Sequence, residues 1–263
     1  APRLAEVLSR NPNRLDAVLT PGFFDRLPDR QSLAEQLDLL LAQARDFEDV
    51  LNVTRRWTND QILWAGIHIL RNITDGERCG PFLSDVRDLT MLIETLDALA
   101  ALEPRVADDF ARRHGRFDGH SMAIVALGKL GSRQMTLRSD LDLIMVYDVP
   151  PGLGTSDGPK PLAPNEYFIR LTQRMINAVT APTGEGRLYD IDMRLRPSGN
   201  SGPLAISLEA FTRYQLNDAW TWEHMALTRA RVIHGPAELA SRLNDAVREI
   251  LTRPRDPDKL LRD

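Results

Sequence analysis

Two patterns of hydrophobic and polar positions divide the sequence near residue 115. Before it, apolar residues recur at spacings of three and four, the period of an amphipathic helix. The stripes are Leu33, Leu37, Leu41, Ala44, Phe47 and Leu51; Ile62, Leu63, Trp64, Ile67 and Leu70; and, after Pro81, Leu83, Val86, Leu89, Ile93, Leu96 and Ala100. No strand pattern precedes residue 120. We therefore expect an all-helical region over 1–115, with short helices within 1–30 and Ser32 capping the first long helix.

After residue 116 the pattern becomes mixed. Short apolar runs at 122–127 and 141–147 predict two strands. Over 187–196, apolar residues alternate with charged ones, which predicts a third, half-buried strand of ten residues. Helical patterns cover about 165–180, 208–218, 220–230 and 236–251. The expected fold class is α+β, with a helical region over 1–115 and a domain with a small mixed sheet over 116–263.

Composition narrows the functional classes. The 263 residues carry a net charge of −4, and the two halves carry −5 and +1, so neither has the basic excess of a general nucleic-acid binder. No apolar run approaches the length of a membrane span. The single cysteine, Cys79, cannot form an internal disulfide, which fits a reducing, cytoplasmic setting. Because the chain opens at Ala1 without an initiator Met, we expect a piece of a longer protein.

Two acidic residues open the second predicted strand. On a strand, Asp140 and Asp142 would project from the same face, while Leu141 and Leu143 face the core. Two ionised carboxylates this close repel each other, and a divalent cation removes that cost. Mg²⁺ favours a few carboxylates together with substrate phosphates. A solvated strand edge is the alternative.

A glycine-containing turn follows the first predicted strand. Gly128 and Gly131 would let backbone N–H groups face an anion, Ser132 adds a hydroxyl, and Lys129 adds a point charge. The turn lacks the earlier glycine of a Walker loop. The alternative is an ordinary β-turn.

A third acid, Asp192, lies on the alternating segment beside Arg194 and Arg196. Arginine forks bind phosphate well, although a surface ladder of ion pairs would look the same. An acidic pair on one strand with a third acid on another is what two-metal phosphoryl or nucleotidyl transfer requires.

A last cluster covers residues 219–231. We expect Trp220 and Trp222 to be core residues, and His224 to be structural. Glu223 is either a helix cap or a residue of the active site.

Three spaced motifs together resemble glutamine synthetase adenylyltransferase. They are Gly128-Lys129-Leu130-Gly131, then Ser139-Asp140-Leu141-Asp142-Leu143-Ile144, then the stretch from Asp192 to Gly199 with Ser201-Gly202-Pro203-Leu204. The resemblance is close over about 120–235 and looser over the helical segment. It implies a polymerase-β-like nucleotidyltransferase fold.

The resemblance also implies roles for residues. Asp140, Asp142 and Asp192 match the metal-binding catalytic carboxylates, for two Mg²⁺ ions. The nucleotide-phosphate positions are matched by Gly128, Lys129, Gly131, Ser132 and Ser139, with Arg194 and Arg196 matching the strand pattern. Position 132 is commonly glycine in the family, so Ser132 is a departure.

The family's proteins have two such modules in one chain, one attaching AMP from ATP to a tyrosine of glutamine synthetase and one removing it by phosphorolysis. The sequence of residues 218–224 resembles that of the carboxy-terminal module, which attaches AMP. The implied partners are ATP, glutamine synthetase and, in the whole enzyme, the PII signalling protein. Three alternatives remain: the AMP-removing module, a nucleotidyltransferase acting on nucleic acid, and a silent regulatory or docking module.

Overall fold

The computed structural model describes residues 24, 26–93, 109–117, 121–150 and 152–255. The short helices predicted within 1–30 fall mainly on residues 1–23, which lie outside the described ranges, and residues 26–29 are not helical. The end of the third helical stripe, at Leu96 and Ala100, also lies outside them. The chain divides into two compact units. The first comprises Ala1–Asp108, Arg133–Asp140 and Asn177–Asp190, and the second comprises Asp109–Ser132, Leu141–Ile176 and Ile191–Asp263. Two short segments from the carboxy-terminal half thus group with the helices, which a single division at residue 115 does not anticipate.

Three packed helices lie in the part of the first unit that the structure describes. They are α2 (Arg30–Leu41), α3 (Phe47–Leu70) and α4 (Gly76–Ile93), and each contacts the other two. Their apolar faces meet in a core that includes Leu33, Leu37, Leu41, Val50, Ile62, Leu83 and Val86, all at most 3% exposed. The described part of 1–115 is therefore helical, as the hydrophobic stripes predict.

The helix ends differ from the prediction because capping, and not apolar spacing, sets them. Asp29 caps α2, its carboxylate accepting the backbone N–H of Ser32 at 2.9 Å, so Ser32 lies inside the helix. The apolar stripe over 33–51 belongs to two helices, because Asp46 starts α3 by accepting the N–H of Asp49. Helix α4 contains Pro81 instead of following it.

Among its described residues, the second unit is built on a five-stranded mixed sheet. The central strand β2 (Leu141–Asp148) pairs antiparallel with β1 (Ser121–Ala126), which pairs antiparallel with β5 (Arg231–His234). On its other edge β2 pairs in parallel with β3 (Ile191–Asp192) near its start and with β4 (Ala205–Ser207) near its end. The sequence predicted β1 and β2 within one residue, but not β4 or β5.

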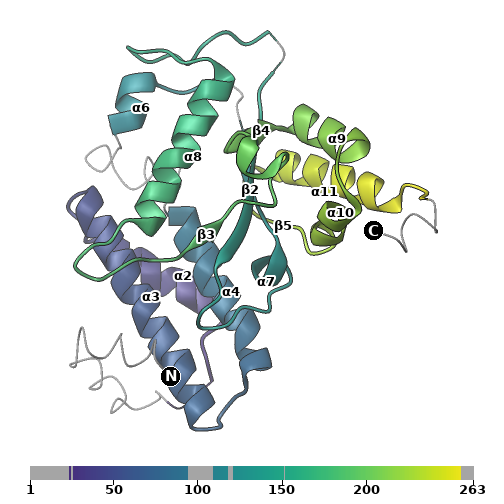
Figure 1. Ribbon diagram of the computed structural model, residues 1–263. Helices are drawn as coiled ribbons and strands as arrows, with labels where there is room; N and C mark the ends of the chain where they lie inside the picture. Colours follow the sequence, from purple (N-terminus) through teal and green to yellow (C-terminus); the bar gives the residue numbers. More distant parts are fainter. Residues whose placement is uncertain (1–23, 25, 94–108, 118–120, 151, 256–263) are drawn as a thin grey trace. The chain divides into compact units, whose positions relative to one another are not determined.

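Helices pack against this sheet. The core of the unit joins strand residues such as Val125 and Val146 to Phe211, Leu227 and Leu243. These last three come from α9 (Leu208–Asn217), α10 (Thr221–Leu227) and α11 (Ala237–Thr252), which gather beside the sheet in Figure 1. Stacked Tyr147 and Phe168 join β2 to α8 (Pro164–Thr180), beside which lies α6 (Asp109–His114).

The predicted ten-residue strand over 187–196 is wrong in length. Only Ile191 and Asp192 pair as a strand, and the chain then turns, through a short 3-10 helix at Gly199–Ser201. Burial follows the predicted alternation only in part. Tyr189 and Met193 are buried, as predicted, but Leu188 and Arg196 are buried as well. Among the helices described here, none combines the length and the apolar character that crossing a membrane requires.

Candidate functional site

The site is organised around two aspartates on neighbouring strands. Asp142 of β2 and Asp192 of β3 are paired residues in a parallel ladder, so their side chains leave the sheet on the same face. Both are partly buried. The sheet therefore brings together two of the three predicted carboxylates, which lie 50 residues apart in the sequence.

Arg194 holds the carboxylate of Asp192. Its backbone N–H donates to Oδ1 at 2.8 Å, and its guanidinium reaches Oδ2 from Nη2 at 2.5 Å. These hydrogen bonds lower the pKa of Asp192 below its ordinary value, against the opposing effect of partial burial. Asp192 is therefore ionised at neutral pH, and the 75% exposed side chain of Arg194 reaches outward from it.

Gly128 lies directly against the other aspartate. It begins the single turn α7 (Gly128–Gly131) with φ +51°, and a Cβ built on it would lie 2.1 Å from Oδ2 of Asp142. The backbone of β2 reinforces this approach, because the carbonyl of Asp142 accepts the N–H of Leu127 at 2.9 Å. Only glycine fits here, for both its backbone conformation and the space that the carboxylate occupies.

The other residues of this turn mainly stabilise the turn itself or pack it against the neighbouring backbone. The hydroxyl of Ser132 donates to the carbonyl of Gly128 at 3.0 Å. A Cβ on Gly131 would lie 1.9 Å from the carbonyl oxygen of Arg229, so this glycine serves close backbone packing. Lys129 is exposed, and its side chain is the part of the turn that reaches solvent.

The third predicted carboxylate follows a closed turn. Ser139 is 7% exposed, and its hydroxyl accepts the backbone N–H of Thr136 at 3.1 Å. This predicted nucleotide-binding residue thus shapes the turn that precedes Asp140. Asp140 itself is exposed, directly before β2.

Arg196 lies in the interior, whereas the alternating pattern predicted that it would lie on the charged face of a strand. It is 8% exposed, and its guanidinium donates to the carbonyls of Met193 at 2.8 Å and Gly202 at 3.2 Å. Burial lowers the pKa of Arg196, and the charge of Asp192 opposes that effect. Arg196 therefore shapes the loop after β3.

Within residues 219–231, the predicted burial of the two tryptophans is wrong. Trp220 and Trp222 are 69% and 51% exposed, so neither is a core residue. Glu223 is 5% exposed and caps α10, accepting the N–H of Trp220 at 2.8 Å and the hydroxyl of Tyr214 at 3.1 Å. His224 is structural, since Nε2 donates to the carbonyl of Gln215 at 2.8 Å.

Sequence reasoning missed Tyr214. Besides Glu223, its hydroxyl receives a hydrogen bond from the backbone of Ser198, which adopts φ +62° in the loop after β3. Burial is the main cause that raises the pKa of Tyr214, and Glu223 adds to it. No sequence signal links this tyrosine to that loop, because the contact depends on how α9 packs.

The donor set suits a hard cation. Mg²⁺ is bound in proteins through one or two carboxylates plus substrate phosphates, and Asp142 with Asp192 supply such a pair on one face. Within the described ranges, no three His, Cys, Asp or Glu side chains are grouped closely enough to hold a metal ion by themselves. The substrate's own phosphate oxygens would have to complete the coordination.

Comparison with known proteins identifies the family. A family described as "Glutamate-ammonia ligase adenylyltransferase" matches residues 1–246. The chain belongs to this family. It is 48% identical over its whole length to the "Bifunctional glutamine synthetase adenylyltransferase/adenylyl-removing enzyme" of Brucella suis biovar 1 (strain 1330), and 44% identical to the proteins of the same name from Bradyrhizobium diazoefficiens and Rhizobium meliloti.

The chain spans about a quarter of these relatives, covering 26% of the length of each. The match includes the helical residues before 116 as well as the sheet. The adenylyltransferase family membership thus extends over both compact units.

Proposed function

We propose that this chain is a nucleotidyltransferase module that transfers AMP from ATP to a tyrosine of glutamine synthetase and so regulates nitrogen assimilation. The observation that carries the proposal is the pairing of Asp142 with Asp192, beside the Gly128 turn, in a member of the adenylyltransferase family. The name of these relatives supports the reaction and the protein substrate. The mixed sheet with helices packed against it is consistent with a polymerase-β-like fold.

The proposed chemistry follows from charge placement. Asp142, Asp192 and Asp140 would hold divalent cations, two in the simplest scheme, which supply charge neutralisation at the phosphates. The ionised state of Asp192 at neutral pH suits this role. Lys129 is exposed and would attract the phosphates of ATP, and the outward guanidinium of Arg194 is placed for the same purpose.

The remaining predicted residues take supporting roles in this proposal. Gly128 leaves room for the carboxylate of Asp142, and Gly131 lets the turn approach the backbone near Arg229. The hydroxyl of Ser132 and that of Ser139 stabilise the turns on either side of 133–138. Arg196 fixes the loop after β3. Catalysis of this kind depends mainly on positioning and on stabilising charge.

A second candidate is removal of AMP from modified glutamine synthetase by phosphorolysis. The relatives' name includes an adenylyl-removing activity, and the chain covers only a quarter of their length. The same carboxylates would serve, with inorganic phosphate as the attacking group. In the longer protein we propose control by the PII signalling protein.

An intact-mass assay distinguishes the two. The protein is incubated with unmodified glutamine synthetase, ATP and Mg²⁺, and separately with AMP-modified glutamine synthetase and phosphate. We expect a gain of one AMP in the first mixture, and Asp142→Asn should make this gain far slower. Loss of AMP in the second mixture alone would establish the removing activity. No change in either mixture would contradict both candidates.

A further inference from the structure

The pairing of the two site aspartates rests on a short ladder. Strands β2 and β3 share two residue pairs, Leu141 with Ile191 and Asp142 with Asp192. So few pairs give little resistance to slippage or fraying of β3. The chain segments that lead into the two strands must therefore help to fix their alignment. Those segments are 133–140 and 177–190, and both belong to the first unit.

One buried arginine contacts both segments. Arg87 of α4 is 0% exposed and donates from Nη2 to the carbonyl of Thr136 at 2.9 Å. Its guanidinium lies 5.2 Å from the centre of the Tyr189 ring, within the range of a cation–π contact. Thr136 precedes Asp142 by six residues, and Tyr189 precedes Asp192 by three.

Other contacts on α4 keep this arrangement in place. Nη1 of Arg87 donates to the carbonyl of Leu83 on its own helix at 2.9 Å, which fixes the side chain before it meets either segment. The hydroxyl of Tyr189 lies 3.1 Å from Oγ1 of Thr90, one turn further along α4. The planar fork of arginine allows two carbonyl contacts and ring stacking at once, which a lysine ammonium cannot reproduce.

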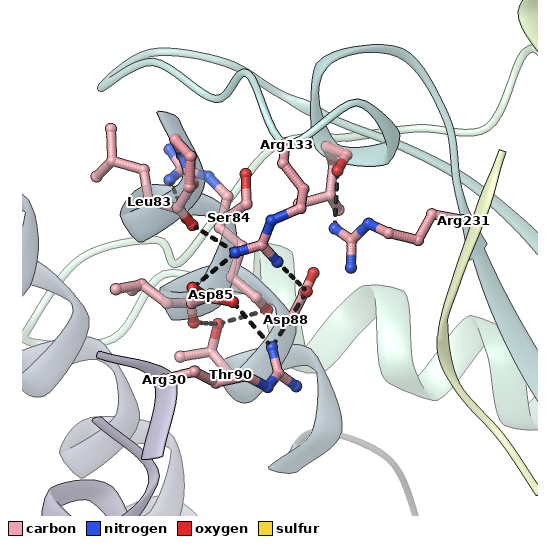
Figure 2. A network of polar contacts seen from close by, with 12 residues as sticks. Arg30, Leu83, Ser84, Asp85, Asp88, Thr90, Arg133 and Arg231 are labelled. Carbon is pink, nitrogen blue, oxygen red and sulfur yellow. Dashed lines mark hydrogen bonds and ion pairs between the residues drawn. The ribbon is translucent and has the colours of Figure 1, made fainter. Parts of the chain in front are cut away.

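Figure 2 shows a second set of contacts between α4 and the segment 133–140. Arg133, with φ +58°, directs its guanidinium to Asp85 at 2.8 Å and to Asp88 at 4.0 Å. Arg30 of α2 reaches the same two carboxylates, at 3.2 and 3.3 Å. Arg30 and Arg133 thus share their partners, but only Arg133 belongs to a segment that leads into the site.

We infer that Arg87 is a positioning residue, which sets the spacing of the segments entering β2 and β3 and thereby the alignment of Asp142 with Asp192. Arg133 assists it on the first of these segments. The inference rests on the proposed function, because the aligned aspartates are those to which nucleotidyl transfer is assigned. The helical unit would on this basis act in catalysis as well as in folding.

The test compares Arg87→Lys and Arg133→Gln with a matched control, Arg30→Gln. The control removes an arginine from the same two carboxylates without touching either segment. Four quantities are measured on each protein: the melting temperature, kcat, KM for ATP, and Mn²⁺ affinity by electron paramagnetic resonance in the presence of a non-hydrolysable ATP analogue.

We expect Arg87→Lys to lower kcat on the order of 10- to 100-fold, as small misplacements of reacting groups do, with little change in KM for ATP. Mn²⁺ binding should weaken in parallel. Arg133→Gln should show the same pattern more weakly, and Arg30→Gln should keep the parental kcat and Mn²⁺ affinity. Should Arg87→Lys fail to fold, Arg133→Gln against Arg30→Gln decides the question.

The inference would be overturned if folded Arg87→Lys kept the parental kcat and Mn²⁺ affinity. It would also be overturned if Arg133→Gln and Arg30→Gln had equal effects. The proposed function fails separately, if the parent protein neither adds nor removes AMP. In that case the Mn²⁺ affinities of the variants still test the inference, because binding requires no turnover.

Discussion

Replacing Gly128 by alanine should affect activity far more than folding. The new Cβ would lie 2.1 Å from Oδ2 of Asp142, whereas real Cβ atoms essentially never approach another heavy atom within 3.0 Å. Either the carboxylate or the turn must therefore move by about 0.9 Å, the difference between these two distances. A carboxylate end moves more cheaply than backbone, so we expect Asp142 to be displaced.

The two consequences differ in size. A non-glycine residue in the left-handed region costs about 1–2 kcal/mol, and the loss of freedom in the unfolded chain returns about 0.4–1 kcal/mol. The free energy of unfolding should therefore fall by only about 1 kcal/mol. A catalytic group misplaced by about 1 Å can lower the rate on the order of 100-fold.

Two other glycines provide controls. Gly152 has φ +81° with nothing within 4 Å of its Cβ position, so Gly152→Ala isolates the backbone strain. Gly131→Ala places a Cβ 1.9 Å from a backbone carbonyl, so it should lower stability more than Gly128→Ala. Urea unfolding and steady-state AMP transfer are measured on all three variants. Transfer by Gly128→Ala at the parental rate, or a loss no greater than that of Gly152→Ala, would refute the reasoning.

Three further predictions concern single side chains. Asp142→Asn should lower AMP transfer by about 100-fold or more with an unchanged melting temperature, because it removes only the negative charge; a large loss of stability would contradict the assignment. Glu223→Ala should lower the free energy of unfolding in urea by about 2 kcal/mol, since it removes a cap and a buried partner of Tyr214, and an unchanged midpoint would show that neither contact matters. Cys79 is fully buried, which raises its pKa, so the folded state retains the thiol proton at a pH where the unfolded chain has lost it. Stability should therefore decline as pH rises above the ordinary thiol value, and iodoacetamide should label native Cys79 only as fast as the protein opens; rapid labelling at pH 8 would be inconsistent with this burial.

The sequence predicted the elements whose signal is local. Strands β1 and β2 are short apolar runs that end at glycine or at charged residues, and α8 and α11 have apolar stripes at helical spacing. The sequence also predicted that acids on two separate strands would lie together, and Asp142 and Asp192 are indeed paired in register. Their assignment to metal binding stays a prediction.

The failures share a physical cause, which is that burial depends on tertiary partners. Arg196, predicted on a charged strand face, is buried because backbone carbonyls accept its hydrogen bonds. Trp220 and Trp222 are apolar yet exposed, because α10 turns other residues toward the core. A ten-residue alternation yielded two residues of strand, since the edge of β2 is shared: its first two residues pair with β3, and Met145–Tyr147 pair with β4. Contacts over more than 40 positions, such as that of Arg87 with Thr136, leave no trace in local spacing.

The four tryptophans of the chain are distributed so that each unit has its own fluorescent reporter. Trp57, at 3% exposure, and Trp64 lie on α3 in the first unit, and Trp220 and Trp222 face solvent in the second. Emission from Trp57 should be blue-shifted and shielded from iodide, whereas emission from the exposed pair should be red-shifted and readily quenched. Denaturation followed at the two emission bands would thus reveal, without any added label, whether the helical unit and the sheet unit unfold together or in turn.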